Sequence, residues 1–431
     1  MQDSIPKHRL SRTLSTSQMA VKIGGNQLGM MIKRPFLSED NQKEAQKKTD
    51  RKNAAILFNT LAMLRGTALK AAQLLSLETD ILPEDFRQEL EKSYHQVPPM
   101  NRALVRKIVS SAFSKPVEEV FNTFDLTAFA AASLGQVHKA VDGKGRVLAV
   151  KIQYPDISKT ISSDIRLLKT AVRPMAQSAL LLPILDEVES VLMAETDYEQ
   201  EAENIRFFKS RLVMPGVRMP DVFPEYSTPQ VLTMSMISGT ALNQWLSEHQ
   251  DPEDKNRVAQ TLHDIFLEGF YGLHRIHADP NPGNFLIADD LSIGLVDFGC
   301  VKSFDPSFIS LYRQLIRTGS TQDKQAYADL LEAMNIVSPQ LAPGIRDELI
   351  HLFMEIGQWF HTLYRDEVFD FAKNHDFIET GKRIAKQMQR YRNHFTSCNP
   401  DFVFLDRTRY GLLRLFEKMQ VKIRIQNSYE C

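Results

Sequence analysis

The chain has 431 residues, enough for one large domain or for two to three coupled domains. Its 43% hydrophobic and 24% charged residues are ordinary for a globular protein, and 52 basic against 53 acidic residues argue against a protein that coats nucleic-acid phosphates. Three widely separated cysteines, Cys300, Cys398 and Cys431, exclude a disulfide scaffold and a cysteine-rich zinc module.

The first part of the chain has helical character. Residues 1–53 are polar and basic, and we expect them to form a mobile arm or a solvated helix face. Apolar residues recur every three or four positions over residues 54–77, which predicts an amphipathic helix. A second helix is expected to begin near Pro83, and a third to cover about residues 101–113. Residues 1–115 are therefore predicted to form a helical extension.

Beyond residue 115, the sequence pattern changes from helical periodicity to short apolar runs. Two short apolar runs, Gln136–Val141 and Val147–Ile152, are joined by a turn that contains glycine, and this predicts a β-hairpin. Residues 156–180 and 185–210 have helical character, and residues 231–236 form the clearest later strand.

The remainder of the chain is mostly helical after Gly239, with a loop-rich stretch at 276–306 in which Phe285–Ile287 is expected to be a short strand. The order of elements predicts an α+β protein. A small mixed unit is expected over residues 116–238, and a larger, mostly helical unit over residues 239–431.

The strongest functional pattern is His277-Ala-Asp-Pro-Asn-Pro-Gly-Asn284, followed by Val296-Asp-Phe-Gly299. Its Asp and Asn, and the later Asp-Phe-Gly, have the spacing of a kinase catalytic loop and metal-binding loop. Phosphoryl transfer needs a carboxylate that orients the attacking hydroxyl or water, and oxygen ligands that hold Mg²⁺ against the phosphates. We therefore expect Asp279 to be catalytic, and Asn284 and Asp297 to bind the metal.

A lysine on a predicted strand, in Leu148-Ala-Val-Lys151, matches the kinase lysine that neutralises nucleotide phosphates and pairs with a helix glutamate. Positions four apart share a helix face, whereas positions two apart do not, so neighbouring acids on one helix can engage two different cations. The candidate acids lie in the following helical stretch, at Glu195, Asp197, Glu199 and Glu201.

An alanine-rich segment stands where a kinase carries a glycine-rich loop. Alanine keeps the small size but loses much of the positive-φ freedom that lets backbone amides curl around phosphates. A small-residue strand packed on its neighbour is the alternative interpretation. The expected nucleotide-binding residues are Phe129, Ala130, Ala131, Ala132, Ser133, Leu134, Gly135, Gln136, Val137, Lys151, Ser235 and Met236.

These segments together resemble the aarF-domain-containing UbiB family of atypical protein-kinase-like ATPases, which is linked to ubiquinone biosynthesis and lipid metabolism. The family's Lys-x-Gly-Gln marker corresponds here to Lys70-Ala71-Ala72-Gln73, in which alanine replaces the glycine. The resemblance implies a two-lobed protein-kinase-like fold whose N-terminal helical extension folds over the substrate site. Lys70 and Gln73 would then project into the active site.

The resemblance also implies roles for the acids. One or both of Glu195 and Asp197 would meet Lys70, and Glu201 would be the partner of Lys151. ATP and Mg²⁺ are the implied cofactors.

The implied activity is ATP hydrolysis or phosphorylation of a small or lipidic molecule, with lipids or isoprenoid-quinone precursors as partners and no nucleic acid. Two alternatives stay open. One is a non-catalytic, nucleotide-gated scaffold for lipid-modifying enzymes, and the other is a true protein kinase.

Membrane and targeting signals are weak. The first 35 residues resemble an organelle transit peptide in composition, but the family resemblance begins near Ser4, so we expect no removable leader. No stretch approaches 18 uninterrupted apolar residues, so no membrane-spanning helix is expected. Residues 401–431 predict a packed final helix with a basic outer face, with an interfacial membrane helix as the alternative. We expect a cytoplasmic protein, with reversible, peripheral membrane contact left open.

Overall fold

The computed structural model describes Gly25 and residues 100–430, apart from residues 133, 174–177, 320, 322, 389 and 392–398. The chain divides into two compact units. The first unit contains the residues up to Gln200 together with Val222–Ser235, and the second contains Glu201–Asp221 together with Met236–Cys431. The helix expected over residues 54–77, the helix expected near Pro83, and the segment with Lys70 and Gln73 lie outside the described residues.

A five-stranded sheet organises the first unit. The predicted hairpin is confirmed: β3 (Gly135–Val141) and β4 (Val147–Gln153) pair antiparallel, and the carboxylate of Asp142 closes the turn by accepting two backbone N–H groups at 2.9 Å. The predicted strand at 231–236 is also confirmed, as β6 (Val231–Ser235) on the other edge of β4. Two short strands, β1 (Thr123–Phe124) and β2 (Ala130–Ala132), pair with β3.

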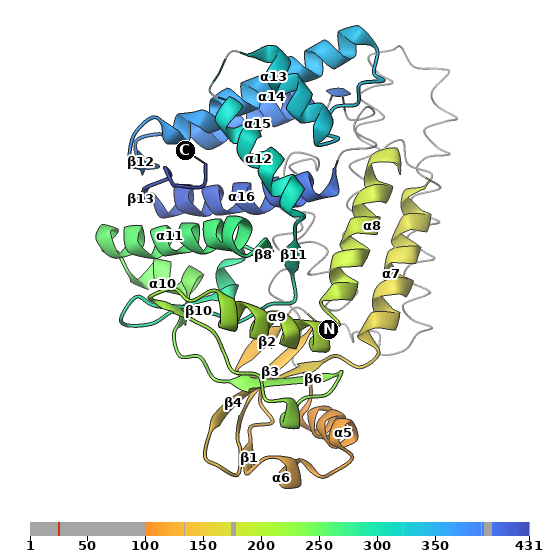
Figure 1. Cartoon of the computed structure of the whole chain (residues 1–431). Coiled ribbons are helices and arrows are strands. Elements are labelled where there is room, and N and C mark those ends of the chain that lie inside the picture. Colours follow the sequence, from red (N-terminus) through yellow and green to blue (C-terminus); the bar gives the residue numbers. More distant parts are fainter. Residues whose placement is uncertain are drawn as a thin grey trace. The chain divides into compact units, whose positions relative to one another are not determined.

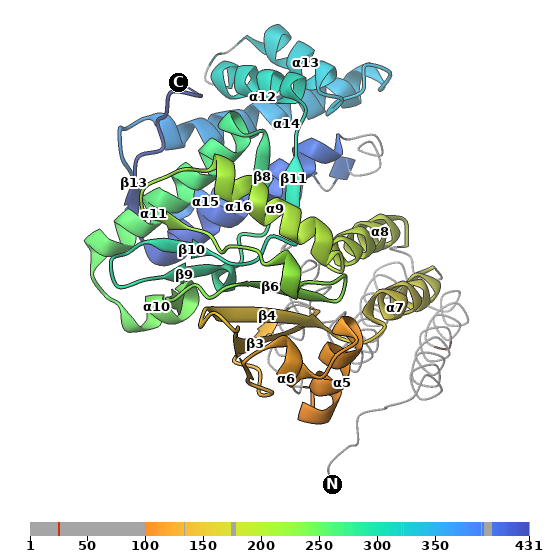
Figure 2. The ribbon, with the colours of Figure 1, turned by 60° about the horizontal axis from the view of Figure 1, so that its bottom comes forward.

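Two helices cover one face of this sheet, α5 (Arg102–Phe113) and α6 (Val117–Val120) (Figure 2). The helix expected at 101–113 is confirmed, and Asn101 caps it by accepting the N–H of Leu104 at 2.8 Å. Successive strand residues point to opposite faces, so every second residue joins the core beneath the helices. That core contains Met100, Val105, Val109, Val117, Phe121, Ala140, Leu148, Val150, Ile152 and Val231.

The same alternation places Val137, Ala149 and Lys151 on the opposite face of the sheet. Val137 lies directly opposite Lys151 in the β3–β4 ladder, and residues that face each other across antiparallel strands share a face. The register of the hairpin therefore decides which side of the sheet carries the lysine.

Three helices follow β4, where two were expected. They are α7 (Ile157–Val172), α8 (Ser178–Ala194) and α9 (Tyr198–Arg211), and the last begins in the first unit and continues into the second. The helical character expected over 185–210 is confirmed except at residues 195–197. The chain turns there, and Asp197 then caps α9 by accepting the N–H of Gln200 at 2.9 Å. Asp197 therefore precedes the helix whose face it was expected to share with Glu201.

The second unit contains several short strands. One sheet has the strand order β5-β10-β9-β7, and a separate ladder joins β8 to β11. The short strand expected at Phe285–Ile287 is confirmed as β9, and the stretch 276–306 is rich in loops as expected. It also contains other short strands that were not predicted, because three-residue strands are too short to show alternation. The strands are β5 (Val217–Arg218), β7 (Thr240–Ala241), β8 (Arg275–His277), β9 (Phe285–Ile287), β10 (Ile293–Leu295) and β11 (Val301–Ser303).

The predicted helical character after Gly239 is confirmed. Aspartates at residues 251, 305 and 323 cap three of the helices with side-chain oxygens, and prolines occupy the first turns of several. The helices are α10 (Leu242–Glu248), α11 (Pro252–Leu267), α12 (Pro306–Thr318), α13 (Lys324–Ala333), α14 (Pro343–His361), α15 (Asp376–Met388) and α16 (Pro400–Met419) (Figure 1). The described residues also contain a π-helix (Glu268–Gly272), the 3-10 turns Pro224–Tyr226, Pro282–Asn284 and Thr362–Tyr364, and the strand pair β12 (Phe369–Asp370) and β13 (Lys422–Ile423).

The basic and apolar segment near the end of the chain is packed into the second unit. α16 ends at Gln420, whose φ of 55° turns the chain away from the helix axis. Phe416, Met419, Val421 and Ile423 are all at most 5% exposed, so the expectation of a packed final helix is confirmed and an interfacial helix of these residues is excluded. Among the helices of the described residues, none has both the length and the apolar character needed to cross a membrane.

Candidate functional site

The segments His277–Asn284 and Val296–Gly299, which match the kinase catalytic and metal-binding loops, lie close together in the second unit. β8 ends at His277, and β11 begins just after the Asp-Phe-Gly segment, with His277 opposite Val301. This ladder is extended by a backbone hydrogen bond from Ala278 N–H to Cys300 O at 2.9 Å, and the ladder of Phe285–Ile287 with Ile293–Leu295 is extended by one from Val296 N–H to Asn284 O at 3.3 Å. The pairing brings together two segments that are about twenty residues apart in the sequence.

Asp279 and Asn284 are hydrogen-bonded to each other. The amide nitrogen of Asn284 donates to the carboxylate Oδ2 of Asp279 at 3.1 Å and to its carbonyl oxygen at 3.2 Å. The turn between them is shaped by Asn281, whose side chain accepts the N–H of Gly283 at 3.0 Å. Because the amide nitrogen of Asn284 is used in this way, its amide oxygen is the atom suited to a metal ion.

The Asp-Phe-Gly segment is anchored by its phenylalanine. Phe298 is completely buried, and its ring centroid lies 5.5 Å from those of both Phe208 and His277. The Nε2 atom of His277 hydrogen-bonds to the carbonyl oxygen of Asp297. The carboxylate of Asp297 accepts the N–H of Gly299 at 3.0 Å, which makes a tight turn. The backbone around the predicted metal ligand is therefore held at several points.

Helix α9 contributes two buried polar side chains to this segment. Oε1 of Glu201 accepts the N–H of Phe298 at 3.3 Å, and Nδ2 of Asn204 donates to the carbonyl oxygen of Phe298 at 3.0 Å. Sequence reasoning selected Glu201 but missed Asn204 and Phe208, and it assigned no role to His277. Helical spacing was the available signal, because positions 201, 204 and 208 share one face of a helix.

The predicted lysine lies in the first unit. Lys151 is 7% exposed on β4, and its Nζ is 5.3 Å from the centroid of the Tyr198 ring, close enough for a cation–π interaction. Two residues further along the same face, Gln153 donates from Nε2 to the carbonyl oxygen of Thr196 at 2.6 Å. This bond ties the turn that contains Glu195 and Asp197 to the strand that carries the lysine. Tyr198 and Gln153 lie in segments that resemble the family, but the sequence assigned no role to either side chain.

The alanine-rich segment is a strand, as the alternative interpretation expected. Ala130 pairs with Val137, and Ala132 pairs with Gly135. Its place in the nucleotide site stays a prediction. Of the other residues expected to bind the nucleotide, Phe129 is half exposed, Leu134 and Gln136 are buried, and Ser133 lies outside the described residues. Ser235 ends β6 opposite Leu148, and Met236 is the first residue of the longer segment of the second unit.

Replacing Gly135 with alanine is expected to lower the free energy of unfolding by about 1–3 kcal/mol. A Cβ atom at this position would lie 2.1 Å from the carbonyl oxygen of Ile152, so β3 and β4 would have to separate. The matched control is Gly143→Ala in the turn of the same hairpin, where a Cβ meets nothing within 4 Å. Urea unfolding of both variants checks this, and equal midpoints would contradict the predicted clash.

The oxygen atoms present suit magnesium. Asn284 and Asp297 offer amide and carboxylate oxygens, the hard ligands that Mg²⁺ prefers, and kinase-type sites complete the shell with phosphate and water. Within the described residues, no group of three or more His, Cys, Asp or Glu side chains is placed to hold a metal ion.

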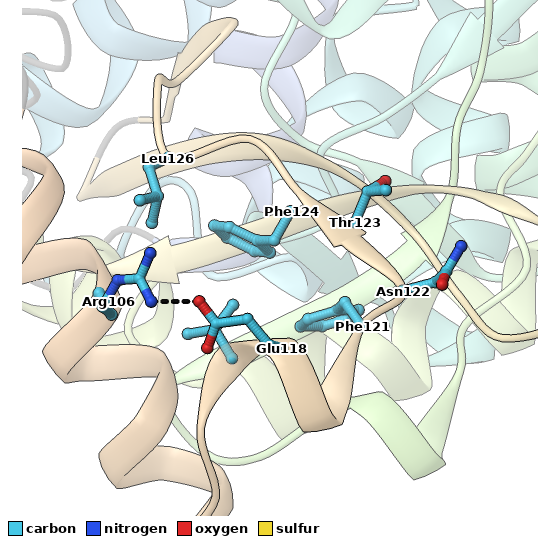
Figure 3. Close-up of a pocket in the computed structure, with 8 residues that line it drawn as sticks. Arg106, Glu118, Phe121, Asn122, Thr123, Phe124 and Leu126 are labelled. Atoms are coloured by element: carbon cyan, nitrogen blue, oxygen red, sulfur yellow. Dashed lines mark hydrogen bonds and ion pairs between the residues drawn. The ribbon is translucent and has the colours of Figure 1, made fainter.

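A small cavity of about 60 Å³ lies elsewhere in the first unit, among α5, α6 and β1 (Figure 3). Arg106 and Glu118 line this cavity and form an ion pair with each other. The cavity is far smaller than the roughly 300–1,000 Å³ of typical ligand pockets, and it contains none of the predicted site residues. It is lined by Arg106, Val117, Glu118, Phe121, Asn122, Thr123, Phe124 and Leu126.

Comparison with known proteins agrees with the resemblance read from the motifs. The chain is 28% identical over 374 residues to "Atypical kinase COQ8, mitochondrial" of Saccharomyces cerevisiae, covering 85% of this chain and 74% of that protein. It is 32% identical over 314 residues to "Protein ACTIVITY OF BC1 COMPLEX KINASE 8, chloroplastic" of Arabidopsis thaliana, covering 69% of this chain but 41% of that protein.

A solved structure and a family model extend the comparison. The Mycobacterium tuberculosis protein Rv3197, solved in complex with erythromycin, matches with a TM-score of 0.58 and 23% identity over 89% of this chain and 96% of that chain, which shows a shared fold. A family model described as "ABC1 atypical kinase-like domain" matches residues 92–331. The predicted kinase-like α+β fold is thereby confirmed. The chain belongs to the UbiB family of proteins with an ABC1 atypical kinase-like domain.

Proposed function

We propose that this protein binds Mg-ATP and uses it as an ATPase or as a kinase for a small or lipidic molecule. The observation that carries the proposal is the hydrogen bond between Asp279 and Asn284. Both residues follow β8, and β8 pairs with β11, the strand that comes after Asp297. In a kinase, a carboxylate orients the nucleophile beside metal-binding amide and carboxylate oxygens. We assign to Asp279 the role of orienting the nucleophile, and to Asn284 and Asp297 the role of binding Mg²⁺. The bound ion would neutralise the charge that develops on the phosphates.

The residues of the first unit have proposed roles of their own. Lys151 would neutralise nucleotide phosphates, and its burial beside Tyr198 supports a preset position for the ammonium group. The segment from Phe129 to Val137 would cover the phosphates, and the backbone at Ser235 and Met236 would meet adenine.

Several parts of the assignment stay predictions. The pairing of Lys151 with Glu201 is one of these, and the roles of Lys70 and Gln73 with the acids Glu195 and Asp197 are others. The expected link to ubiquinone or other lipid metabolism comes from the family. The cytoplasmic location and reversible membrane contact likewise await a test.

The test uses the purified full-length chain. We expect phosphate release from ATP that requires Mg²⁺, and an increase in Tm with ADP that is larger with Mg²⁺ than without it. Magnesium-dependent stabilisation by ADP without any phosphate release would contradict the ATPase and leave the small-molecule kinase and the nucleotide-gated scaffold. Absence of both effects would contradict nucleotide binding and remove the proposal.

A further inference from the structure

One face of α9 contacts Phe298 with three side chains. Glu201, Asn204 and Phe208 follow each other at steps of three and four residues, which places them on the same side of a helix. The first two make hydrogen bonds to the backbone of Phe298 at 3.3 Å and 3.0 Å, and the third packs against its ring. Both polar side chains are buried, at 1% exposed for Glu201 and 6% for Asn204.

These contacts act on the two peptide groups that flank Phe298. The first joins Asp297 to Phe298, and it is held by Glu201 at its N–H and by His277 at its carbonyl oxygen. The second joins Phe298 to Gly299. Its carbonyl oxygen accepts from Asn204 and its N–H donates to the Asp297 carboxylate.

Holding both peptide planes determines the local backbone. A residue has only two soft dihedral angles, so fixing the planes on either side of Phe298 sets its φ and ψ. The second plane donates its N–H to the carboxylate of Asp297, so its orientation also sets the direction of that carboxylate. Asn204 is the side chain from α9 that acts on this second plane.

We propose that Asn204 is a positioning residue for the magnesium site: its amide holds the Phe298–Gly299 peptide so that the carboxylate of Asp297 faces the metal. The proposal rests on the function proposed above and adds a residue that the kinase-like motifs do not contain. An amide is required, because it donates a hydrogen bond, whereas an ionised carboxylate of the same shape would face the carbonyl oxygen of Phe298 and repel it.

The experiment compares Asn204→Asp with the wild-type full-length chain. Mg²⁺ is titrated at a fixed ADP concentration, and the readout is the Mg²⁺ concentration that gives half of the maximal increase in Tm. Loss of one buried hydrogen bond corresponds to a change of about fivefold, so we expect the variant to need at least about five times more Mg²⁺.

The matched control is Tyr327→Phe. The Tyr327 hydroxyl is a buried donor to the carbonyl oxygen of Phe353 at 3.0 Å in the same unit, so this variant also loses one buried side-chain-to-backbone hydrogen bond. It should lower Tm without nucleotide but leave the Mg²⁺ requirement at the wild-type value. If Asn204→Asp does not fold, Asn204→Ser removes the same bond without adding a charge.

The outcomes separate this inference from the proposed function. If an Asn204 variant has a lower Tm but the wild-type Mg²⁺ requirement, Asn204 is merely structural and the inference is overturned. If the wild-type chain itself shows no magnesium-dependent stabilisation by ADP, the proposed function and the inference both fail.

Discussion

Replacing Asp279 with asparagine is expected to lower kcat for Mg-ATP turnover by about 10²–10⁴-fold, the usual contribution of a positioned general base. Asparagine keeps the shape and still offers an oxygen to the amide of Asn284, which now donates to Asp279 at 3.1 Å. It lacks the basic carboxylate that orients the nucleophile. The fold should therefore persist while the chemical step fails, which a coupled assay of ADP release and a thermal unfolding curve would measure together.

The control for this variant is Asp289→Asn, an exposed aspartate in the same unit and outside the catalytic segment. Its turnover should equal that of the wild-type chain. Retention of wild-type kcat by Asp279→Asn would refute the assignment of the catalytic carboxylate. A large loss of Tm would instead show that Asp279 stabilises the β8–β11 region.

Replacing Arg409 with methionine is expected to lower the free energy of unfolding by about 3–5 kcal/mol, the cost of leaving one buried charge without its partner. The guanidinium of Arg409 makes two hydrogen bonds to the carboxylate of Glu430, at 2.6 Å and 2.9 Å, and both residues are at most 5% exposed. The hydroxyl of Tyr271 also donates to Glu430 at 2.7 Å. Denaturant unfolding at neutral pH measures the loss.

The loss of stability should depend on pH with a defined sign. Burial acts to raise the pKa of Glu430, but the charge and hydrogen bonds of Arg409, with those of Tyr364 and Asn427, lower it to about 2 from its ordinary 4.5. In the wild-type chain this carboxylate stabilises the fold fully above pH 4.5, and its contribution is lost as the pH falls toward 2. Without Arg409, burial dominates and raises the pKa of Glu430.

The two proteins should therefore differ less at mildly acidic pH than at neutral pH, because a protonated Glu430 can be buried without a partner at lower cost. Equal differences at both pH values would contradict this account of the buried pair. The matched control is Arg106→Met, which breaks an ion pair with Glu118. The two side chains are 52% and 61% exposed, so this variant should lower the free energy of unfolding far less than Arg409→Met does.

Local patterns in the sequence predicted much of the fold. The hairpin of β3 and β4 follows from two apolar runs and a turn in which Asp142 accepts neighbouring N–H groups. The helix expected at about residues 101–113 is α5, and the structure adds its Asn101 cap. The break between α8 and α9 was missed because a single capping aspartate, Asp197, interrupts a stretch that otherwise looks helical.

The candidate site, too, was predicted only in part from the sequence. Spacing along the chain was enough to select Asp279, Asn284 and Asp297 as candidates, because the kinase pattern has particular residue types at particular separations. The contacts that hold them were decided by tertiary structure. Asn204 reaches Phe298 across 94 residues of sequence, and no local pattern records a hydrogen bond formed only when a helix packs against a distant loop.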